Sequence, residues 1–205
     1  VRVPTDTSSA AYWLVAAICH PSAKVTVLNV GINKTRTGVI DALRSMGGKL
    51  TIMNRRLEGG EEVADIMAES SNLKAIEISG ALVPRLIDEI PVISLAACFA
   101  EGTTIIRDAA ELRVKESDRI KATVTELSRL GGNIRELEDG MEIEGTGMLR
   151  GASGWSHGDH RLAMTLGVAG LLANGETQIA GSESASVSYP TFWNDIQLLV
   201  KGSSE

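Results

Sequence analysis

An apolar helical pattern followed by a β-branched strand pattern occurs three times in this chain, and this repeat limits the possible folds more than any other feature. Each copy is predicted to be a helix, a turn and a strand. The predicted helix and strand pairs are 9–19 with 25–28, 88–100 with 103–106, and 160–173 with 176–179. Aromatic residues make up only 3% of the chain, so aliphatic side chains are expected to fill the core.

The turns of the three copies can be aligned with one another. Ala23, Gly102 and Gly175 take equivalent places in their turns. The offset that superposes Ala23 on Gly102 also superposes Cys19 on Cys98, which is a small independent check on the repeat. The three copies are therefore interpreted as related structural units.

A second helix is predicted after the strand of each copy. It spans 37–46 in the first copy and 118–130 in the second, and the glycine pairs that follow both fit the left-handed residue that ends a helix. In the third copy Pro190 is predicted to open the last helix, where its missing N–H is harmless. Further strands are predicted at 49–53, 133–136 and 141–143. The repeating unit is thus helix, strand, helix, strand, strand.

These units predict an α/β (α+β) fold. Residues 1–205 are expected to form a single domain with units at approximately 5–75, 76–148 and 149–205, arranged around a pseudo-threefold axis with helices inside and sheets outside. A doubly wound nucleotide-binding fold fits less well. Its strands would alternate more regularly, and here no Gly-x-Gly-x-x-Gly follows a strand.

Charge and cysteine content narrow the function classes. The formal net charge is −6 without a basic run, which argues against nucleic-acid binding. No apolar run approaches the roughly 18 residues that cross a bilayer, and the first residues do not resemble a signal peptide.

Cys19 and Cys98 lie in apolar helical stretches and are expected to be reduced thiols of a cytoplasmic protein. Two cysteines and three scattered histidines do not form a metal-binding pattern.

The starts of the three repeated helices are predicted to attract anions. The alignment places Ser9, Asp88 and Arg161 at these starts. If the three helices point the same way, their N-termini offer partial positive charge and free N–H groups to one ligand. The residues of N-cap type near these starts are Asp6, Ser8, Asp88 and Asp159.

The segment Arg113–Arg119 combines cations and acids at the start of the second helix of the middle copy. Lys115 and Arg119 are four residues apart, so they share one helix face. One interpretation is a solvated, salt-bridged helix start. The other is a clamp for phosphate and carboxylate groups, with Glu116 as an acid beside it, because the arginine fork matches both anions.

The other candidate residues, taken one at a time, also fit either a structural or a ligand-binding role. Asp88 alone fits an N-cap, His160 alone fits a structural or surface histidine, and Arg161 alone fits a surface salt bridge. Their predicted convergence with Arg113–Arg119 at one end of the axis favours an active site for a small, highly anionic substrate.

Several segments resemble the EPSP synthase (5-enolpyruvylshikimate-3-phosphate synthase) family, and the resemblance extends in order over essentially the whole chain. The most specific segments are Lys-Glu-Ser-Asp-Arg at 115–119 and Asp-His-Arg at 159–161. The segments that carry the resemblance are 5–10, 35–38, 86–91, 113–119, 158–164 and 188–190.

The resemblance implies a transferase of the shikimate pathway of aromatic amino acid biosynthesis. Such enzymes move the enolpyruvyl group of phosphoenolpyruvate to the 5-hydroxyl of shikimate 3-phosphate, release phosphate, need no metal or organic cofactor, and are inhibited by glyphosate. Their fold is two domains, each an inverse α/β barrel-like arrangement of three βαβαββ-type units. This chain resembles the C-terminal domain, so the complementary N-terminal domain is an implied partner.

The resemblance also implies a role for each matching residue. Asp88 is expected to bind the shikimate hydroxyls and act as the base, and Glu116 to act as the acid near the methylene carbon. Lys115 is expected to bind ligand and stabilise charge. The residues implied in phosphoenolpyruvate binding are Arg119, His160 and Arg161.

Two departures from the family pattern leave alternatives open. Val187 stands where a lysine is often found. The other domain, with its ligand contacts and a strand that would complete one sheet here, has no counterpart in this chain. The alternatives to an enzyme half that is inactive alone are a non-catalytic anion-binding domain of the same fold and an enolpyruvyl transferase with another acceptor.

Overall fold

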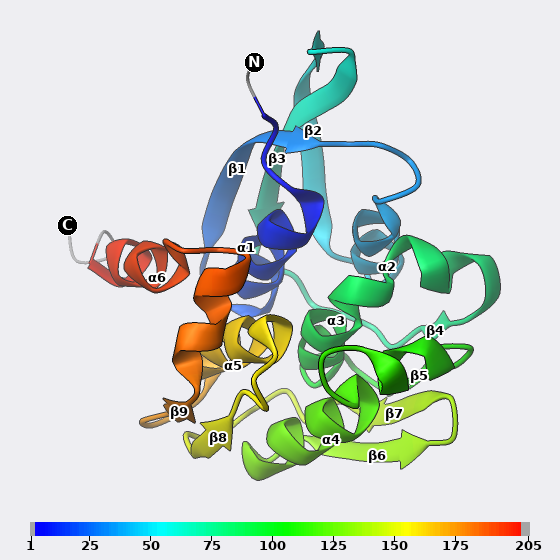
Figure 1. Ribbon diagram of the computed structural model, residues 1–205, viewed down its shortest axis with the longest axis vertical. Helices are drawn as coiled ribbons and strands as arrows, with labels where there is room; N and C mark the ends of the chain where they lie inside the picture. The colour runs from blue at the N-terminus through cyan, green and yellow to red at the C-terminus, as the bar shows by residue number, and fades with distance from the viewer. Residues whose placement is uncertain (1–2, 202–205) are drawn as a thin grey trace.

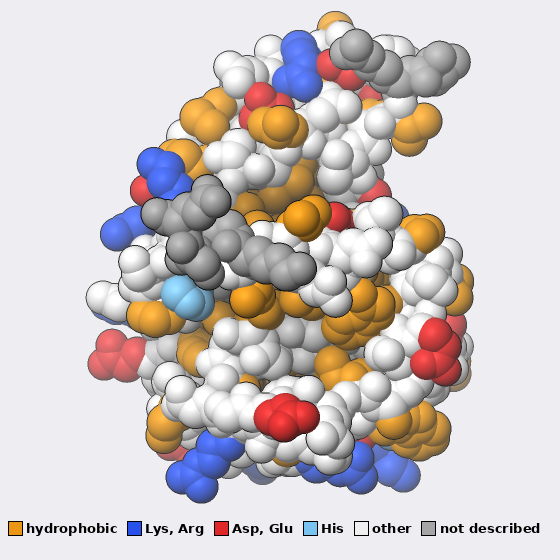
Figure 2. All heavy atoms as spheres, turned by 90° about the vertical axis from the view of Figure 1, so that its left-hand side faces the viewer, with side chains coloured by type: hydrophobic (Ala, Val, Ile, Leu, Met, Phe, Trp, Pro, Cys, Tyr) orange, Lys and Arg blue, Asp and Glu red, His pale blue; other side chains and the backbone are white. Residues whose placement is uncertain are grey.

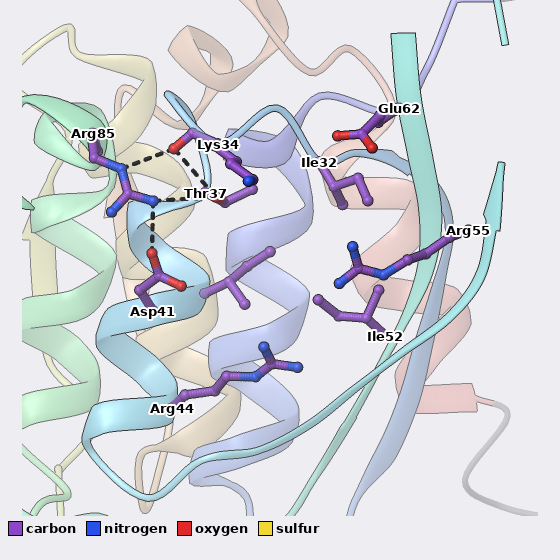
Figure 3. A pocket seen from close by; sticks show the side chains of 10 residues that line it. Ile32, Lys34, Thr37, Asp41, Arg44, Ile52, Arg55, Glu62 and Arg85 are labelled. Carbon is purple, nitrogen blue, oxygen red and sulfur yellow. Dashed lines mark hydrogen bonds and ion pairs between the residues drawn. The ribbon is translucent and has the colours of Figure 1, made fainter. Parts of the chain in front are cut away.

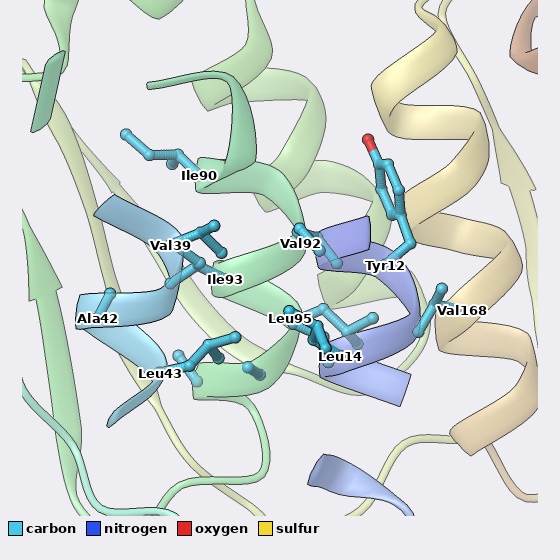
Figure 4. Close-up of a cluster of buried hydrophobic side chains, with 14 of the residues drawn as sticks. Tyr12, Leu14, Val39, Ala42, Leu43, Ile90, Val92, Ile93, Leu95 and Val168 are labelled. Carbon is cyan, nitrogen blue, oxygen red and sulfur yellow. The ribbon is translucent and has the colours of Figure 1, made fainter. Parts of the chain in front are cut away.

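Three largely buried helices lie side by side at the centre of the molecule. The computed structural model describes residues 3–201 (Figure 1). The central helices are α1 (Thr7–Cys19), α3 (Ile90–Ala97) and α5 (His160–Leu172), and each contacts the other two. Leu14, Leu95 and Val168 bring the three helices together in the core (Figure 4). The predicted aliphatic core is confirmed.

The few aromatic residues gather at one side of α1. Phe192 packs its ring on Trp13, with 5.2 Å between the ring centroids, and Trp13 donates a hydrogen bond from Nε1 to the Tyr189 hydroxyl at 3.0 Å. Gly167 in α5 makes room for this cluster, because a Cβ at that position would lie 2.8 Å from the Phe192 ring. The cluster therefore fixes the C-terminal segment on α1 and α5.

The first sheet is antiparallel and has the order β1-β3-β2. Its strands β2 and β3 form a long hairpin, of which only the beginning of β2 is predicted from the sequence. Ile66 and Ala68 of β3 face the core and are fully buried. The elements of this unit after α1 are β1 (Lys24–Gly31), α2 (Gly38–Ser45), β2 (Lys49–Glu58) and β3 (Glu61–Glu69).

The second sheet has the order β4-β5-β7-β6. The predicted strand 103–106 is β5 (Thr103–Ile106), which pairs parallel with β4 and antiparallel with β7. The two-residue strand β4 is too short to carry a pattern in the sequence. The remaining elements are β4 (Glu77–Ile78), α4 (Arg119–Arg129), β6 (Asn133–Leu137) and β7 (Gly140–Glu144).

The third sheet differs from the predicted unit. It contains β8 (Ser153–Trp155) and β9 (Gln178–Ala180), paired in parallel, and it is followed by α6 (Phe192–Lys201). The order helix, strand, helix, strand, strand is complete in the first two copies, where strands are predicted after the second helix, and α6 is the last element of the described residues. The three sheets lie on different sides of the central helices (Figure 1).

Two predicted helix starts are wrong. The helix expected from Asp88 begins at Ile90, and Asp88 lies in the 3₁₀ turn η2 (Ile87–Glu89) that precedes it. Pro91 explains the shift, because proline is favoured in the first turn of a helix. Pro190 does not open the last helix, which begins two residues later at Phe192. The other 3₁₀ turns are η1 (Gly80–Arg85), η3 (Ala110–Val114) and η4 (Ser182–Val187).

Both cysteines are free thiols, as predicted. Burial raises the pKa of Cys98 to about 12, so this thiol stays protonated and unreactive at neutral pH. Among the described helices, none is long and apolar enough to cross a membrane.

Candidate active site

The N-terminal ends of the central helices meet through side-chain contacts. Asp159 caps α5 by accepting a hydrogen bond from the Arg161 backbone N–H at 2.9 Å. Asp6 caps α1 by accepting from the Ser9 N–H at 3.2 Å. The cluster of charged residues described below lies where these helix ends converge, as the alignment of the repeats predicts.

Arg119 is the most buried cation of this cluster, with 1% of its side chain exposed. It stands in the first turn of α4, whose N-cap Asp118 accepts from the Lys121 N–H. Its Nε donates to Asp159 Oδ2 at 2.8 Å and its Nη1 donates to Asp88 Oδ1 at 3.0 Å. Its Nη2 donates to Glu116 Oε2 at 2.5 Å. Three carboxylates from three segments thus share one guanidinium.

Asp88 lies between two arginines. Its Oδ2 is 3.4 Å from Arg161 Nη2, while its Oδ1 accepts from Arg119. Burial alone would raise the pKa of Asp88, but the positive charges of Arg161 and Arg119 outweigh it and hold the pKa below the ordinary value. Asp88 is therefore ionised at neutral pH and is able to accept a proton or a hydrogen bond.

Arg161 is less well paired than Arg119. Its Nη1 lies 3.6 Å from Glu89 Oε1, and its Nε and Nη1 have no hydrogen-bond partner among the described residues. Buried donors of a guanidinium that lack acceptors are unusual, because an unmade hydrogen bond to a charged group is costly. Arg161 therefore keeps hydrogen-bonding capacity that the described residues do not use.

The Lys115 side chain is held by an acid that the sequence did not single out. Its Nζ lies 2.5 Å from Glu111 Oε1. Its charge nevertheless contributes to lowering the pKa of Asp88, so Lys115 lies on the same cluster. Arg113 donates to Glu136 and to backbone carbonyls of the β6–β7 hairpin, and its Nη1 also donates to Asp118 Oδ2 at 3.0 Å. Arg113 therefore ties the hairpin to the N-cap of the helix that carries Arg119.

His160 is the first residue of α5 and is half-buried. Burial lowers its pKa, and the positive charge of Arg161 lowers it further. His160 is thus neutral at neutral pH, and its ring offers both a donor and an acceptor beside the arginines.

A second layer of polar residues connects the cluster to α1 and to the loop before α2. Ser8 donates a short hydrogen bond from its hydroxyl to Glu89, and it accepts one at 3.1 Å from Arg36 Nη2. Burial raises the pKa of Glu89, although the hydrogen bond from Ser8 opposes this. Sequence reasoning missed Glu89 and the role of Ser8, and the adjacent acids at 88 and 89 were the only available signal.

Acid is expected to destabilise the folded protein through Asp88 and Asp159. Burial alone would raise the pKa of Asp159, but the hydrogen bond and the positive charge of Arg119 lower it by more, so the pKa of Asp159 lies below its ordinary value. A lowered carboxyl pKa stabilises the fold above the unfolded pKa of about 3.9, and this contribution is lost as the pH falls through the folded pKa. Urea unfolding midpoints measured between about pH 6 and pH 2.5 should therefore fall less steeply for Asp159→Asn than for the wild type. Parallel curves would show that Asp159 is not linked to acid unfolding.

Comparison with known proteins identifies the family of this chain. A family model described as EPSP synthase (3-phosphoshikimate 1-carboxyvinyltransferase) matches residues 1–196.

The chain belongs to the EPSP synthase family.

EPSP synthase relatives cover nearly all of this chain. The 3-phosphoshikimate 1-carboxyvinyltransferase of Roseiflexus castenholzii is 58% identical over 194 residues, which are 95% of this chain and 45% of the relative. The enzyme of that name from Thermoanaerobacter sp. is 54% identical over 199 residues, or 97% of this chain and 47% of the relative. The chain therefore spans about half the length of the curated relatives it matches.

Solved EPSP synthase structures share the fold. An EPSP synthase structure from Acinetobacter baumannii superposes with a TM-score of 0.90 at 45% identity, covering 94% of this chain and 45% of that chain. A second structure from the same organism gives a TM-score of 0.91 at 41% identity. The predicted α/β class and the predicted family are confirmed.

One buried acid outside the EPSP synthase motifs holds the site in place. Glu126 in α4 is fully buried, and its carboxylate lies 2.8 Å from His157 Nε2. It also accepts from the Trp155 backbone N–H at 3.0 Å and from Arg129 Nη1. Trp155 stacks on His157 with 4.2 Å between ring centroids. Glu126 therefore ties the loop before Asp159 to the helix that carries Arg119.

Replacing Glu126 with glutamine is expected to destabilise the protein by about 2 kcal/mol, because an amide cannot accept from all of these donors. Arg129→Gln is the matched control. Arg129 is half-exposed, so its loss should change the free energy of unfolding by less than about 1 kcal/mol. Urea unfolding monitored by circular dichroism would measure the free energy of unfolding of both variants. An equal decrease in Glu126→Gln and Arg129→Gln would show that the contact with Arg129 alone accounts for the stabilisation by Glu126.

Val187 is 79% exposed in η4. The position where a lysine is often found in the family therefore carries an exposed aliphatic side chain in this chain.

Proposed function

We propose that this chain is part of an EPSP synthase and supplies one wall of its active site. The complete enzyme would transfer the enolpyruvyl group of phosphoenolpyruvate to the 5-hydroxyl of shikimate 3-phosphate. The 5-oxygen bonds to C2 of phosphoenolpyruvate while C3 takes a proton; loss of a proton from C3 then expels phosphate from C2. The observation that carries the proposal is the convergence of Asp88, Glu116, Arg119 and Arg161 in a chain of this family.

Asp88 is proposed to be the base for the 5-hydroxyl and a ligand of the shikimate hydroxyls. The arginines on both sides keep it ionised. Substrate anions that engage Arg119 and Arg161 would weaken this stabilisation and make the carboxylate a stronger base for the attacking hydroxyl. Lys115 would stabilise negative charge that develops beside it. His160, neutral and at the N-terminus of α5, would bind substrate next to Arg161.

Glu116 is proposed to be the acid that protonates C3. In the present structure half of its side chain is exposed and it is bound to Arg119. The carboxylate or phosphate of phosphoenolpyruvate would replace Glu116 on Arg119 Nη2, because both anions fit the same fork. Once released from Arg119, the Glu116 carboxyl would be free to turn towards C3 and act there as the proton donor.

The missing part of the enzyme is proposed to dock on the third sheet. In the first and second sheets a hairpin pairs with β1 and β5, whereas among the described residues β9 pairs only with β8. The helix α6 also carries exposed hydrophobic side chains, with Leu198 and Val200 more than half exposed. Figure 2 shows hydrophobic side chains gathered on this face, where a groove runs between α1, α5 and α6. A two-stranded hairpin from the N-terminal part would cover the open edge of β9 and this groove.

The finer architecture belongs to the same proposal. We take the chain to be one domain, with units at about 5–75, 76–148 and 149–205, in an inverse α/β barrel-like arrangement. Its support is that parallel pairing recurs at equivalent places, in β4–β5, in β8–β9 and in the bridge between Thr5 and Val30. A cytoplasmic location is supported by the two free cysteines, and inhibition by glyphosate by the family alone.

Phosphate release from shikimate 3-phosphate and phosphoenolpyruvate tests the function. Full-length protein is expected to turn over, and this chain alone is expected to be inactive until the N-terminal part is added. Arg161→Ala should weaken phosphoenolpyruvate binding by at least about tenfold. Arg36→Ala should weaken it less, since Arg36 contacts Ser8 and Asp6 instead of the cluster. Inactive full-length protein would contradict the function, and turnover by the chain alone would contradict the need for a second part.

A further inference from the structure

A pocket of about 460 Å³ lies between α2 and the first sheet, outside the cluster around Arg119. Figure 3 shows its two walls, with the α2 helix on one side and strands β2 and β3 on the other. Three isoleucines, Ile32, Ile40 and Ile52, supply apolar lining, and Figure 3 shows Ile32 and Ile52 beside Arg55. This volume is in the range of small-molecule sites, which are concave and have an apolar lining with a few polar groups.

The pocket gathers cations that have no counter-charge. Lys34, Arg44 and Arg55 line it, and none of them forms an ion pair with any residue that the structure describes. Arg44 donates only to the Leu50 carbonyl, at 3.1 Å. Figure 3 shows Arg44 and Arg55 extending into the pocket from opposite walls. All three residues are exposed, so water screens their mutual repulsion, and an anion between them would offset the rest of it.

The acids of the pocket do not balance these cations. Asp41 is bound to Arg85 at 2.7 Å, so this pair is internally neutral. Glu62 on β3 is the one further acid that lines the pocket. Three cations thus face one unpaired acid, although the whole chain has a formal net charge of −6. A local excess of positive charge in an acidic protein is expected to bind an anion.

We propose that this pocket binds a small organic anion, namely a carboxylate or phosphate on an apolar body. The forked guanidinium groups of Arg44 and Arg55 suit the anionic head, and the three isoleucines suit the apolar body.

Binding at this pocket would act on the cluster through one loop. Lys34 and Thr37 line the pocket, and Arg36 between them donates to Ser8. Ser8 in turn donates to Glu89, the neighbour of Asp88. This coupling, but not the binding itself, rests on the proposed function. A ligand held by Lys34 would bias the position of Arg36 and so the rate of the reaction.

Methyl NMR of the full-length protein, with labelled isoleucine δ1 groups and benzoate as the probe, tests the binding. Benzoate is expected to shift the signals of Ile32, Ile40 and Ile52. The variant Arg44→Gln/Arg55→Gln should bind benzoate at least about tenfold more weakly. Arg107→Gln, at an exposed arginine outside the pocket, is the matched control and should bind as the wild type does.

Three outcomes would overturn the proposed site or its specificity. Equal benzoate affinity in the wild type and the double variant would show that Arg44 and Arg55 do not bind the anion. Shifts confined to Ile90, next to Glu89, would assign binding to the cluster around Arg119 instead. Inorganic phosphate that binds as tightly as benzoate would show that the apolar lining adds nothing.

The coupling has a separate test. Benzoate is expected to change the rate of phosphate release in the wild type and to leave the rate of Arg44→Gln/Arg55→Gln unchanged. Isoleucine shifts without a change in the rate would overturn the coupling while the site stands. Full-length protein without any turnover would contradict the proposed function and leave the NMR result as the test of the pocket.

Discussion

Asp88→Asn in the full-length protein is expected to lower kcat for phosphate release by about 10³-fold, which is typical of the loss of a general base. An asparagine keeps the size of the side chain but cannot take the proton of the attacking hydroxyl. It also leaves Arg119 and Arg161 without the carboxylate that they share. Stopped assays of released phosphate at saturating substrates would measure the effect.

The matched control for Asp88→Asn is Glu142→Gln. Glu142 also pairs with an arginine, Arg135, but it lies in the β6–β7 hairpin away from the cluster. Its replacement should leave kcat within about twofold of the wild type. A similar loss of kcat in both variants would mean that removing any paired acid impairs the enzyme, and the role of Asp88 as the base would be refuted. Raising the pH should not rescue Asp88→Asn, because an amide does not titrate.

Asp159→Asn is expected to destabilise the protein by about 3–5 kcal/mol, because it removes a carboxylate from a buried ion pair. Asp159 and Arg119 are both almost completely buried, and Nε of Arg119 would lose its charged acceptor. Asparagine still caps a helix well, so the loss reflects the ion pair and not the cap. Urea unfolding of the full-length protein near neutral pH would measure the change.

The variant Asp6→Asn separates the contribution of helix capping from that of the buried ion pair. Asp6 also caps a central helix, but its side chain is 57% exposed and its contact with Arg36 is long, at 3.7 Å. The change should cost less than about 1 kcal/mol. Equal losses in Asp6→Asn and Asp159→Asn would show that capping, and not the buried pair, determines the effect at 159.

The parts of the fold that follow from the sequence are those with strong periodic patterns. The helices α1, α2 and α4 and the strand β5 lie within a residue or two of the predicted bounds, because each combines an apolar face with a turn or glycine at its end. The short strands β4 and β8 could not be predicted. Each exists through parallel pairing with a strand more than twenty residues away, and such pairing is a property of the whole fold.

The candidate site likewise contains residues that the sequence marks and residues that it does not mark. The residues named from the sequence, among them Lys115, Arg119 and Arg161, do lie together, because helix starts and family motifs marked them. Their partner Glu111 and the supporting acid Glu126 carried no local signal, and Glu89 was marked only by its place next to Asp88. Contacts of this kind join residues that are distant in sequence or are ordinary surface types. Their catalytic roles remain predictions that the kinetic experiments test.

The stacking of Trp155 on His157 provides an optical sensor within the molecule. Trp155 is half-exposed and is the last residue of β8, directly before the loop that leads to Asp159, whereas Trp13 is buried in the aromatic cluster. Indole emission responds to the polarity of the surroundings and to a stacked imidazole. A ligand that moves the loop would therefore change the emission of Trp155 and leave that of Trp13 constant. Fluorescence of a variant without Trp13 and Trp193 would follow substrate binding in real time, without any added dye.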